Sequence, residues 1–331
     1  MTRQQTRRGA VRLVVGLVVS AVFVVLTLSR VDLRETAAAL GRVNFGMILL
    51  AVPVVGLELV LRAIRWQRLL QPIAPIALRQ TTAYLAIGYF ANSMLPARLG
   101  DVARALLAGR AFNIGRLAVL GTIVVERLAD GLFILAAVAV LGLTVAGGAS
   151  LASTALWLGA LGIAGIAVLW LALSWVRRPV GGRVRTLLRS FVERVLLGVQ
   201  GVRSPSVAIS TALLTVAAFA TAVGMFAVVA GAADAGLTLA QSALVMGGLA
   251  LSTSIPAGPS SIGTYEFVGL TILTSLGLAP EPALAIVVLV HLVATVPVAL
   301  AGLVAAWQLH FRFSELAGDA EPANLAAPDP T

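Results

Sequence analysis

The feature that most constrains this chain is a series of long apolar runs, each close to the ~20 residues that an α-helix needs to cross a bilayer. The runs lie at 11–29, 45–61, 117–146, 152–176, 206–231 and 282–307. Of the 331 residues, 59% are hydrophobic and 11% charged, whereas soluble domains carry about 25% charged residues. The sequence therefore predicts an all-α polytopic membrane protein with six full spans.

Arginine sets the expected orientation. All 24 basic residues are arginine, and they lie between the apolar runs, so the net charge of +10 indicates membrane topology rather than nucleic-acid binding. The arginine-rich segments 3–12, 62–79 and 177–203 are expected in the cytoplasm, the last as an amphipathic helix on anionic headgroups. We expect one membrane domain, 1–313, in the cell membrane, with an uncleaved signal anchor and both termini cytoplasmic. A disordered acidic tail, 314–331, follows it.

The stretch "NSMLPARLGDVAR" interrupts a run whose two ends are both expected on the cytoplasmic side. Pro96 has no amide hydrogen and disfavours helix in the residue before it. Half-helices at 80–94 and 98–109 are therefore expected to form a re-entrant hairpin over 80–109.

A second interrupted segment, 240–277, contains Pro256, Gly258, Pro259 and Gly263. Its neighbours place both of its ends outside, so it predicts a hairpin opposed to the first. Paired interrupted segments in the two halves of a chain indicate an inverted repeat and a transporter's midplane site.

The first break carries Arg98, Asp101 and Arg104, spaced every third residue. Two arginines against one aspartate leave surplus positive charge near a helix N-terminus, which suits a lipid phosphate. The alternative is an ion network, with Asp101 paired to its neighbours, that only holds the hairpin together.

The segment "VVERLAD" places Glu126, Arg127 and Asp130 on a membrane-spanning helix. We expect a buried Arg127–Asp130 pair, with Glu126 holding Arg98 or Arg104. A proton-coupling role for Glu126 or Asp130 is the alternative.

The second break offers hydroxyls and backbone amides for phosphate near a helix start. The candidate residues here are Ser260, Ser261, Gly263, Thr264 and Glu266. Glu266 is equally explained as a helix cap. Two further groups have structural interpretations: His291 as a satisfied packing histidine, with a proton relay as the alternative, and Glu58 with Arg62 as an interfacial salt bridge.

Three blocks resemble the flippase-like family that corresponds to the transmembrane domain of lysylphosphatidylglycerol synthases (multiple peptide resistance factor proteins). They are "GYFANSMLPARLGDVARALL", "VVERLADGLF" and "SIPAGPSSIGTYEFVGL". The resemblance covers roughly 10–310 and implies lipid translocation. It departs from the synthases in two ways: "SELAGDAEPANLAAPDPT" stands in place of their soluble domain, and His291 stands where a basic residue is expected.

Three functions are consistent with these features. The first is a transporter that moves an anionic phospholipid or polyprenyl-phosphate lipid between leaflets. The second is a non-catalytic subunit of a separately encoded partner enzyme. The third is a lipid-linked glycosyl- or phospho-transferase using Asp32 and Glu35 as metal ligands. No cysteine, metal motif or nucleotide loop is present in the sequence, so no cofactor is expected, and membrane lipids are the expected partners.

Overall fold

The computed structural model describes residues 3–95, 99–145, 192–255 and 257–309, with side chains from residue 14 onward. Every regular element in these ranges is a helix, and they contain no strand. The elements are α1 (Arg3–Leu28), α2 (Leu33–Gly41), α3 (Phe45–Leu70), α4 (Leu78–Met94), α5 (Leu99–Ala111), α6 (Arg116–Thr144), η2 (Gln200–Arg203), α9 (Pro205–Ala232), α10 (Leu239–Ser252), η3 (Pro259–Ser261), α11 (Thr264–Ser275) and α12 (Pro280–Gln308).

Three of the described helices, α3, α9 and α12, are long and apolar enough to cross a membrane. A fourth candidate span consists of the described part of α1 with α2, which are bent by 82° relative to each other. The protein is thus an all-α membrane protein. The full set of six spans stays a prediction, and the run at 152–176 lies outside the described residues.

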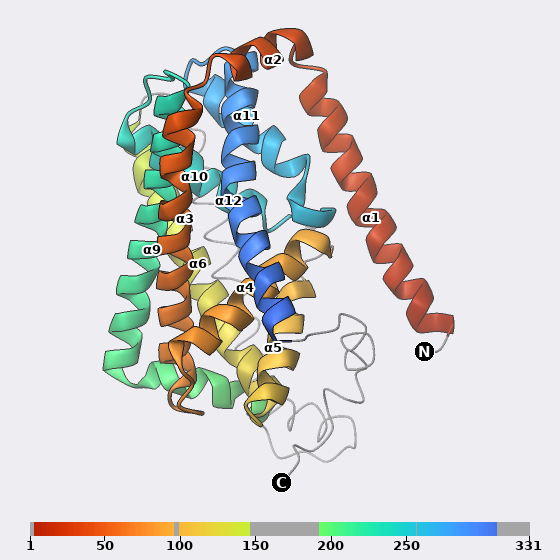
Figure 1. Cartoon of the computed structure of the whole chain (residues 1–331), viewed down its shortest axis with the longest axis vertical. Helices are drawn as coiled ribbons and strands as arrows, with labels where there is room; N and C mark the ends of the chain where they lie inside the picture. Colours follow the sequence, from red (N-terminus) through yellow and green to blue (C-terminus); the bar gives the residue numbers. More distant parts are fainter. Residues whose placement is uncertain (1–2, 96–98, 146–191, 256, 310–331) are drawn as a thin grey trace.

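The long helices form a bundle in which α3 packs mainly on α9, and α12 mainly on α4 (Figure 1). The first helix stands to one side of this bundle and contacts it through α11 and η3. Its outward residues, including Val15, Val18 and Val25, are exposed. Exposed apolar side chains are expected where a helix faces lipid rather than protein.

Two apolar clusters hold the bundle together. One joins α3, α9, α10, α11 and α12 around fully buried Phe226, Leu273 and Ile286. The other joins α3, α4, α5 and α6 around Trp66 and Leu85. The chamber described below lies between elements of both clusters, so both fix its walls.

The first break separates α4 from α5, which pack on each other. Gly100 is required there, because a Cβ at this position would lie 2.1 Å from the Gly88 carbonyl oxygen. The helix bounds agree closely with the expected half-helices at 80–94 and 98–109. That the pair leaves the membrane on the side where it enters stays a prediction.

The second break separates α10 from α11 and contains η3. Gly263 has a φ of 91°, and Ser260 and Ser261 have φ values of 57° and 59°. Side chains with a Cβ rarely adopt such left-handed conformations. The turn at Ser260 and Ser261 is therefore strained and must be held by its surroundings.

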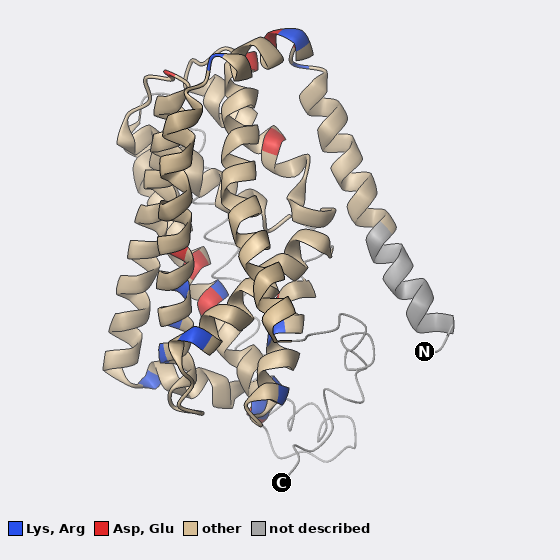
Figure 2. Cartoon of the chain, viewed as in Figure 1, with Lys and Arg blue, Asp and Glu red and all other residues tan. Residues whose placement is uncertain are grey.

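Charged residues gather near the ends of the bundle and in one patch inside it (Figure 2). The tail 314–331 and the first part of the basic segment, 177–191, lie outside the described residues. The described remainder of the basic segment is helical over 192–199. It packs tightly on α6, since a Cβ on Gly198 would lie 1.9 Å from the Ala118 carbonyl oxygen.

Candidate functional site

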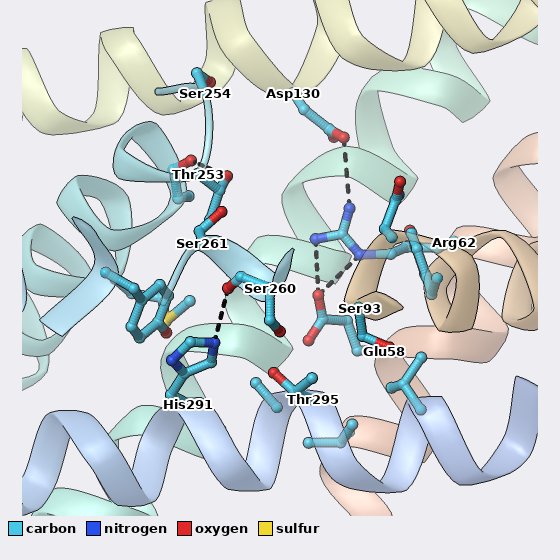
Figure 3. Close-up of a pocket in the computed structure, with 18 of the residues that line it drawn as sticks. Glu58, Arg62, Ser93, Asp130, Thr253, Ser254, Ser260, Ser261, His291 and Thr295 are labelled. Carbon is cyan, nitrogen blue, oxygen red and sulfur yellow. Dashed lines mark hydrogen bonds and ion pairs between the residues drawn. The ribbon is translucent and has the colours of Figure 1, made fainter. Parts of the chain in front are cut away.

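A cavity of about 420 Å³, which we call the chamber, lies among α3, α4, α6, α10, α12 and the η3 turn (Figure 3). Glu58, Asp130 and His291 line it from near the middle of helices of 26, 29 and 29 residues. At 1.5 Å per residue, helices of this length cover the hydrocarbon core of a bilayer. The chamber therefore lies far from both ends of these helices.

One wall of the chamber is charged. Arg62 lies between two carboxylates, with Glu58 at 2.7 Å and Asp130 at 3.4 Å (Figure 3). Asp130 also accepts a hydrogen bond from the buried Arg65. Glu58, Arg62 and Arg65 follow one another at i, i+4 and i+7, so one face of α3 presents all three side chains.

Behind this wall lies a buried extension of the same network. Arg104 donates to Glu126 at 2.5 Å, and Arg65 approaches the other oxygen of Glu126 at 3.5 Å. The Arg104 guanidinium also lies 4.3 Å from the centroid of the Trp66 ring, a cation–π distance. Charges removed from water need such close partners, because an unpaired one is strongly destabilising.

Asp101 joins the network through α6. Its carboxylate is gripped by two nitrogens of Arg127, at 2.9 and 3.0 Å, and accepts a hydrogen bond from Asn92 at 3.4 Å. Arg127 approaches Asp130 only to 3.9 Å. The expected Arg127–Asp130 pair is thus present but secondary, and α6 supplies a two-nitrogen ion pair to Asp101 that the sequence did not predict.

The network is formally neutral over the described residues. Its four arginines, Arg62, Arg65, Arg104 and Arg127, face four carboxylates, Glu58, Asp101, Glu126 and Asp130. α3 and α6 contribute three arginines and three acids to it, so they leave the charge balance of the first break unchanged, and the surplus positive charge expected from Arg98, Asp101 and Arg104 stays a prediction. Arg98 itself lies outside the described residues.

The opposite wall carries hydroxyl groups. Ser260 and Ser261 of η3 face the charged wall across the chamber, and Thr295 of α12 lies beside them (Figure 3). The Tyr265 hydroxyl is buried and has no hydrogen-bond partner among the described residues. Buried polar groups without a partner are rare in proteins, so this hydroxyl stands out beside the chamber.

A histidine bridge holds this second wall. His291 Nδ1 lies 2.5 Å from Glu266 Oε1, and its Nε2 lies 3.0 Å from the Ser260 carbonyl oxygen. Glu266 also caps α11 by accepting from the Gly263 amide at 2.6 Å. The capping interpretation of Glu266 therefore applies, and both ring nitrogens of His291 have partners, as in a satisfied packing histidine, although this residue also lines the chamber.

The structure thus brings the end of α4 and the η3 turn to one cavity. Among the predicted site residues, Arg127, Asp130, Ser260 and Ser261 line the chamber. Asp101, Arg104, Glu126, Gly263, Thr264 and Glu266 support its walls from behind. Sequence reasoning missed Arg65, Asn92 and Ser93, and it placed Glu58 and Arg62 at the membrane surface; the i, i+4, i+7 spacing on α3 is the signal that could have found that wall.

One of the two metal ligands considered for a transferase has a capping role. Asp32 caps α2, and one of its carboxylate oxygens accepts from the amides of Arg34 and Glu35 at 2.7 and 3.2 Å. Within the part of the chain that the structure describes, no group of three acids or histidines could hold a metal ion.

Comparison with known proteins identifies the wider relationship. A family model described as the lysylphosphatidylglycerol synthase TM region matches residues 13–302. The search of curated proteins gave no match. The matched range contains the chamber and both breaks.

Proposed function

Because the chain belongs to the lysylphosphatidylglycerol synthase TM region family, we propose that it moves a phosphate-bearing lipid, either an anionic phospholipid or a polyprenyl phosphate, between the leaflets of a bilayer. The observation that carries this proposal is the chamber itself, with its paired charges halfway along three long helices. The membrane character of the protein is established by its helices and its family.

The physical need for such a chamber is clear. A charged group at the bilayer centre costs roughly 2.5–3.5 kcal/mol even on the mildest scales. A lipid headgroup that crosses alone meets the same barrier, whereas a polar cavity at that depth replaces its lost water. Intramembrane charges mark substrate pathways for this reason.

The charged wall offers phosphate two exchangeable contacts. Arg62 and Arg127 hold Glu58 and Asp101 at 2.7 and 2.9 Å, but they approach Asp130 only at 3.4 and 3.9 Å. A phosphate could take the place of Asp130 beside both guanidinium groups. Asp130 would keep its bond to Arg65, so no buried charge would lose its last partner.

The hydroxyl wall would bind the remainder of the headgroup. Ser260, Ser261 and Thr295 line it, and their hydroxyl groups can donate hydrogen bonds to a headgroup. Acyl or prenyl chains would stay in the surrounding lipid while the headgroup passed between the walls.

The distribution of arginine supports the proposed orientation. The ends of α3 and α5 and the start of α6 carry Arg68, Arg110 and Arg116, and η2 carries Arg203. In Figure 2, basic residues gather toward the lower end of the bundle, with others at the upper end near α2. By the positive-inside rule we assign the lower end of the bundle to the cytoplasmic side of the cell membrane.

Lipid exchange in liposomes tests the proposal. Purified protein is reconstituted with fluorescent phosphatidylglycerol, and the fraction accessible to an external quencher is followed over time. We expect exchange with the unaltered chain and at least a tenfold loss in Arg62→Gln and Arg127→Gln, with Arg68→Gln as the control outside the chamber. Exchange at the rate of empty liposomes, or equal rates in all three variants, would overturn it.

The family description names a synthase, which favours a second candidate: a membrane subunit that presents a lipid to a separately encoded enzyme. In that case a photoactivatable phospholipid would crosslink in the chamber while liposomes showed no exchange between leaflets.

A further inference from the structure

We propose that Glu266 and His291 form a proton-binding site, and that its proton travels with the lipid phosphate. The coupling to lipid rests on the proposed function, whereas the proton site and its effect on the Ser260–Ser261 turn do not. The site follows from counting the protons that the hydrogen bonds require.

Both ring nitrogens of His291 face oxygen acceptors. Nε2 lies 3.0 Å from the Ser260 carbonyl, which can only accept, so Nε2 must carry a hydrogen. Nδ1 lies 2.5 Å from Glu266 Oε1, and that bond needs a second proton, on either the nitrogen or the oxygen. Glu266 Oε2 already accepts from the Gly263 amide at 2.6 Å. The pair therefore holds two protons and is neutral in sum.

Loss of one proton cannot leave both bonds of the histidine intact. Neutral imidazole has one N–H, and the carboxylate of Glu266 attracts it more strongly than a carbonyl does. The remaining hydrogen would therefore stay between Nδ1 and Glu266. The lone pair on Nε2 would then face the Ser260 carbonyl oxygen, and that contact would become repulsive.

The backbone of the turn at Ser260 and Ser261 is strained, so its conformation depends on the contacts around it. Both residues have left-handed φ values, 57° and 59°, which are unfavourable for residues with a Cβ. The bond from His291 is one of the contacts that hold Ser260 in this conformation. Without it the turn could relax, and because it forms one wall of the chamber, the cavity would change shape.

The other titratable groups around the chamber are tyrosines, arginines, or acids that are already paired with arginine. They are Tyr265 on α11, whose ring lies beside that of His291, Tyr89 on α4, Glu58 and Arg62 on α3, and Arg127 and Asp130 on α6. The two acids among them are bound by Arg62 and Arg65. Histidine is the side chain whose charge ordinarily changes at physiological pH.

The electrostatic consequence fixes the direction of coupling. Proton release to chamber water changes the pair from neutral to singly negative. A phosphate on the opposite wall would then face one more negative charge, and it would do so as the turn loosened. Both effects favour departure of the headgroup, so the proton and the phosphate should bind together and move in the same direction.

Cysteine labelling tests the proton site without any lipid measurement. The chain has no cysteine, so a single Ser261→Cys reports the turn alone. Its labelling rate by a maleimide is measured from pH 5 to pH 9 and divided by the rate of the same unfolded protein at each pH. We expect the normalised rate to rise several-fold with pH, while Ser254→Cys, elsewhere on the chamber wall, changes little.

Two second-site variants make the outcome specific. In Glu266→Gln the amide donates to Nδ1 permanently and still accepts from Gly263, so labelling at position 261 should stay low at every pH. In His291→Gln it should be independent of pH. A rise with pH that persists in both variants, or no rise in their parent, would overturn the proton site.

A second measurement isolates the coupling. In liposomes with the membrane potential clamped, an imposed pH gradient should bias fluorescent phosphatidylglycerol toward the alkaline side, and Glu266→Gln should abolish the bias. If labelling depends on pH but no lipid exchange occurs, the proposed function is rejected and the proton site is still supported. Lipid exchange that ignores the gradient would reject the coupling.

Discussion

Arg104 of α5 donates a hydrogen bond to Glu126 of α6 at 2.5 Å, and both side chains are at most 3% exposed. This ion pair fastens the first broken helix pair to the long helix that carries the charged chamber wall. The pair matters most for Arg104: without Glu126 this buried guanidinium would face no acid among the described residues, whereas Glu126 would keep Arg65 at 3.5 Å.

Removing one side of this pair should be costlier than removing both. Glu126→Leu should lower stability by about 3–5 kcal/mol, since it strands the buried Arg104. The double variant Arg104→Met with Glu126→Leu should recover part of that loss. Thermal unfolding in detergent measures both, and an unchanged midpoint in the single variant would contradict the assigned burial.

The contact between α4 and α5 should depend on a single glycine. Gly100→Ala would place a Cβ 2.1 Å from the Gly88 carbonyl oxygen and 2.6 Å from the Asn92 amide nitrogen, so the two helices must separate. We expect marked destabilisation and loss of lipid exchange. Gly224→Ala is the matched control: nothing lies within 4 Å of its Cβ, and alanine gains about 0.8–1 kcal/mol over glycine in a helix. Equal behaviour of the two variants would refute the close packing.

The re-entrant path of α4 and α5 predicts a specific labelling pattern. Single cysteines replace Ala111 at the end of α5, Ser204 before α9, and Asp234 after α9. An impermeant maleimide should reach positions 111 and 204 only from the cytoplasmic side, and position 234 only from outside. Labelling of position 111 from outside would restore a conventional membrane crossing.

Removing the charge of Asp130 should lower both the stability of the protein and the rate of lipid exchange. Asp130 accepts from Arg65 and also faces Arg62 and Arg127. Asp130→Asn keeps the shape but leaves these arginines with one less acid, so we expect a lower unfolding midpoint. Leaflet exchange should fall as well, because phosphate held by surplus positive charge would leave slowly. Faster exchange in this variant would contradict the role given to Asp130.

The sequence predicted the fold class well because hydropathy alone determines which segments enter a membrane. Hydropathy and Pro96 indicated helices close to α4 and α5, since a proline blocks helix in the residue before it. The partners of the charged residues could not be predicted in this way. Asp101 pairs with Arg127, and Arg65 with Asp130, across helices far apart in sequence, and only packing decides such contacts.

Only some residues of the candidate site could be predicted from the sequence, because packing decides which of the others meet. Arg127, Asp130, Ser260 and Ser261 stood out because charge or glycine and proline interrupt apolar runs around them. Glu58 and Arg62 have the spacing of an ordinary surface pair, and His291 lies alone in an apolar run. Their role appears only when α3 and α12 are seen to face the same chamber.

The most direct test of the account is to block the chamber after the protein has folded. Ser93→Cys places one thiol on the chamber wall, and Ser204→Cys places one outside it. Each reconstituted variant is alkylated with a bulky permeant maleimide, and exchange of fluorescent phosphatidylglycerol is measured before and after. We expect alkylation at position 93 to stop exchange and alkylation at position 204 to have no effect. Undiminished exchange with position 93 fully alkylated would show that the headgroup does not pass through this cavity.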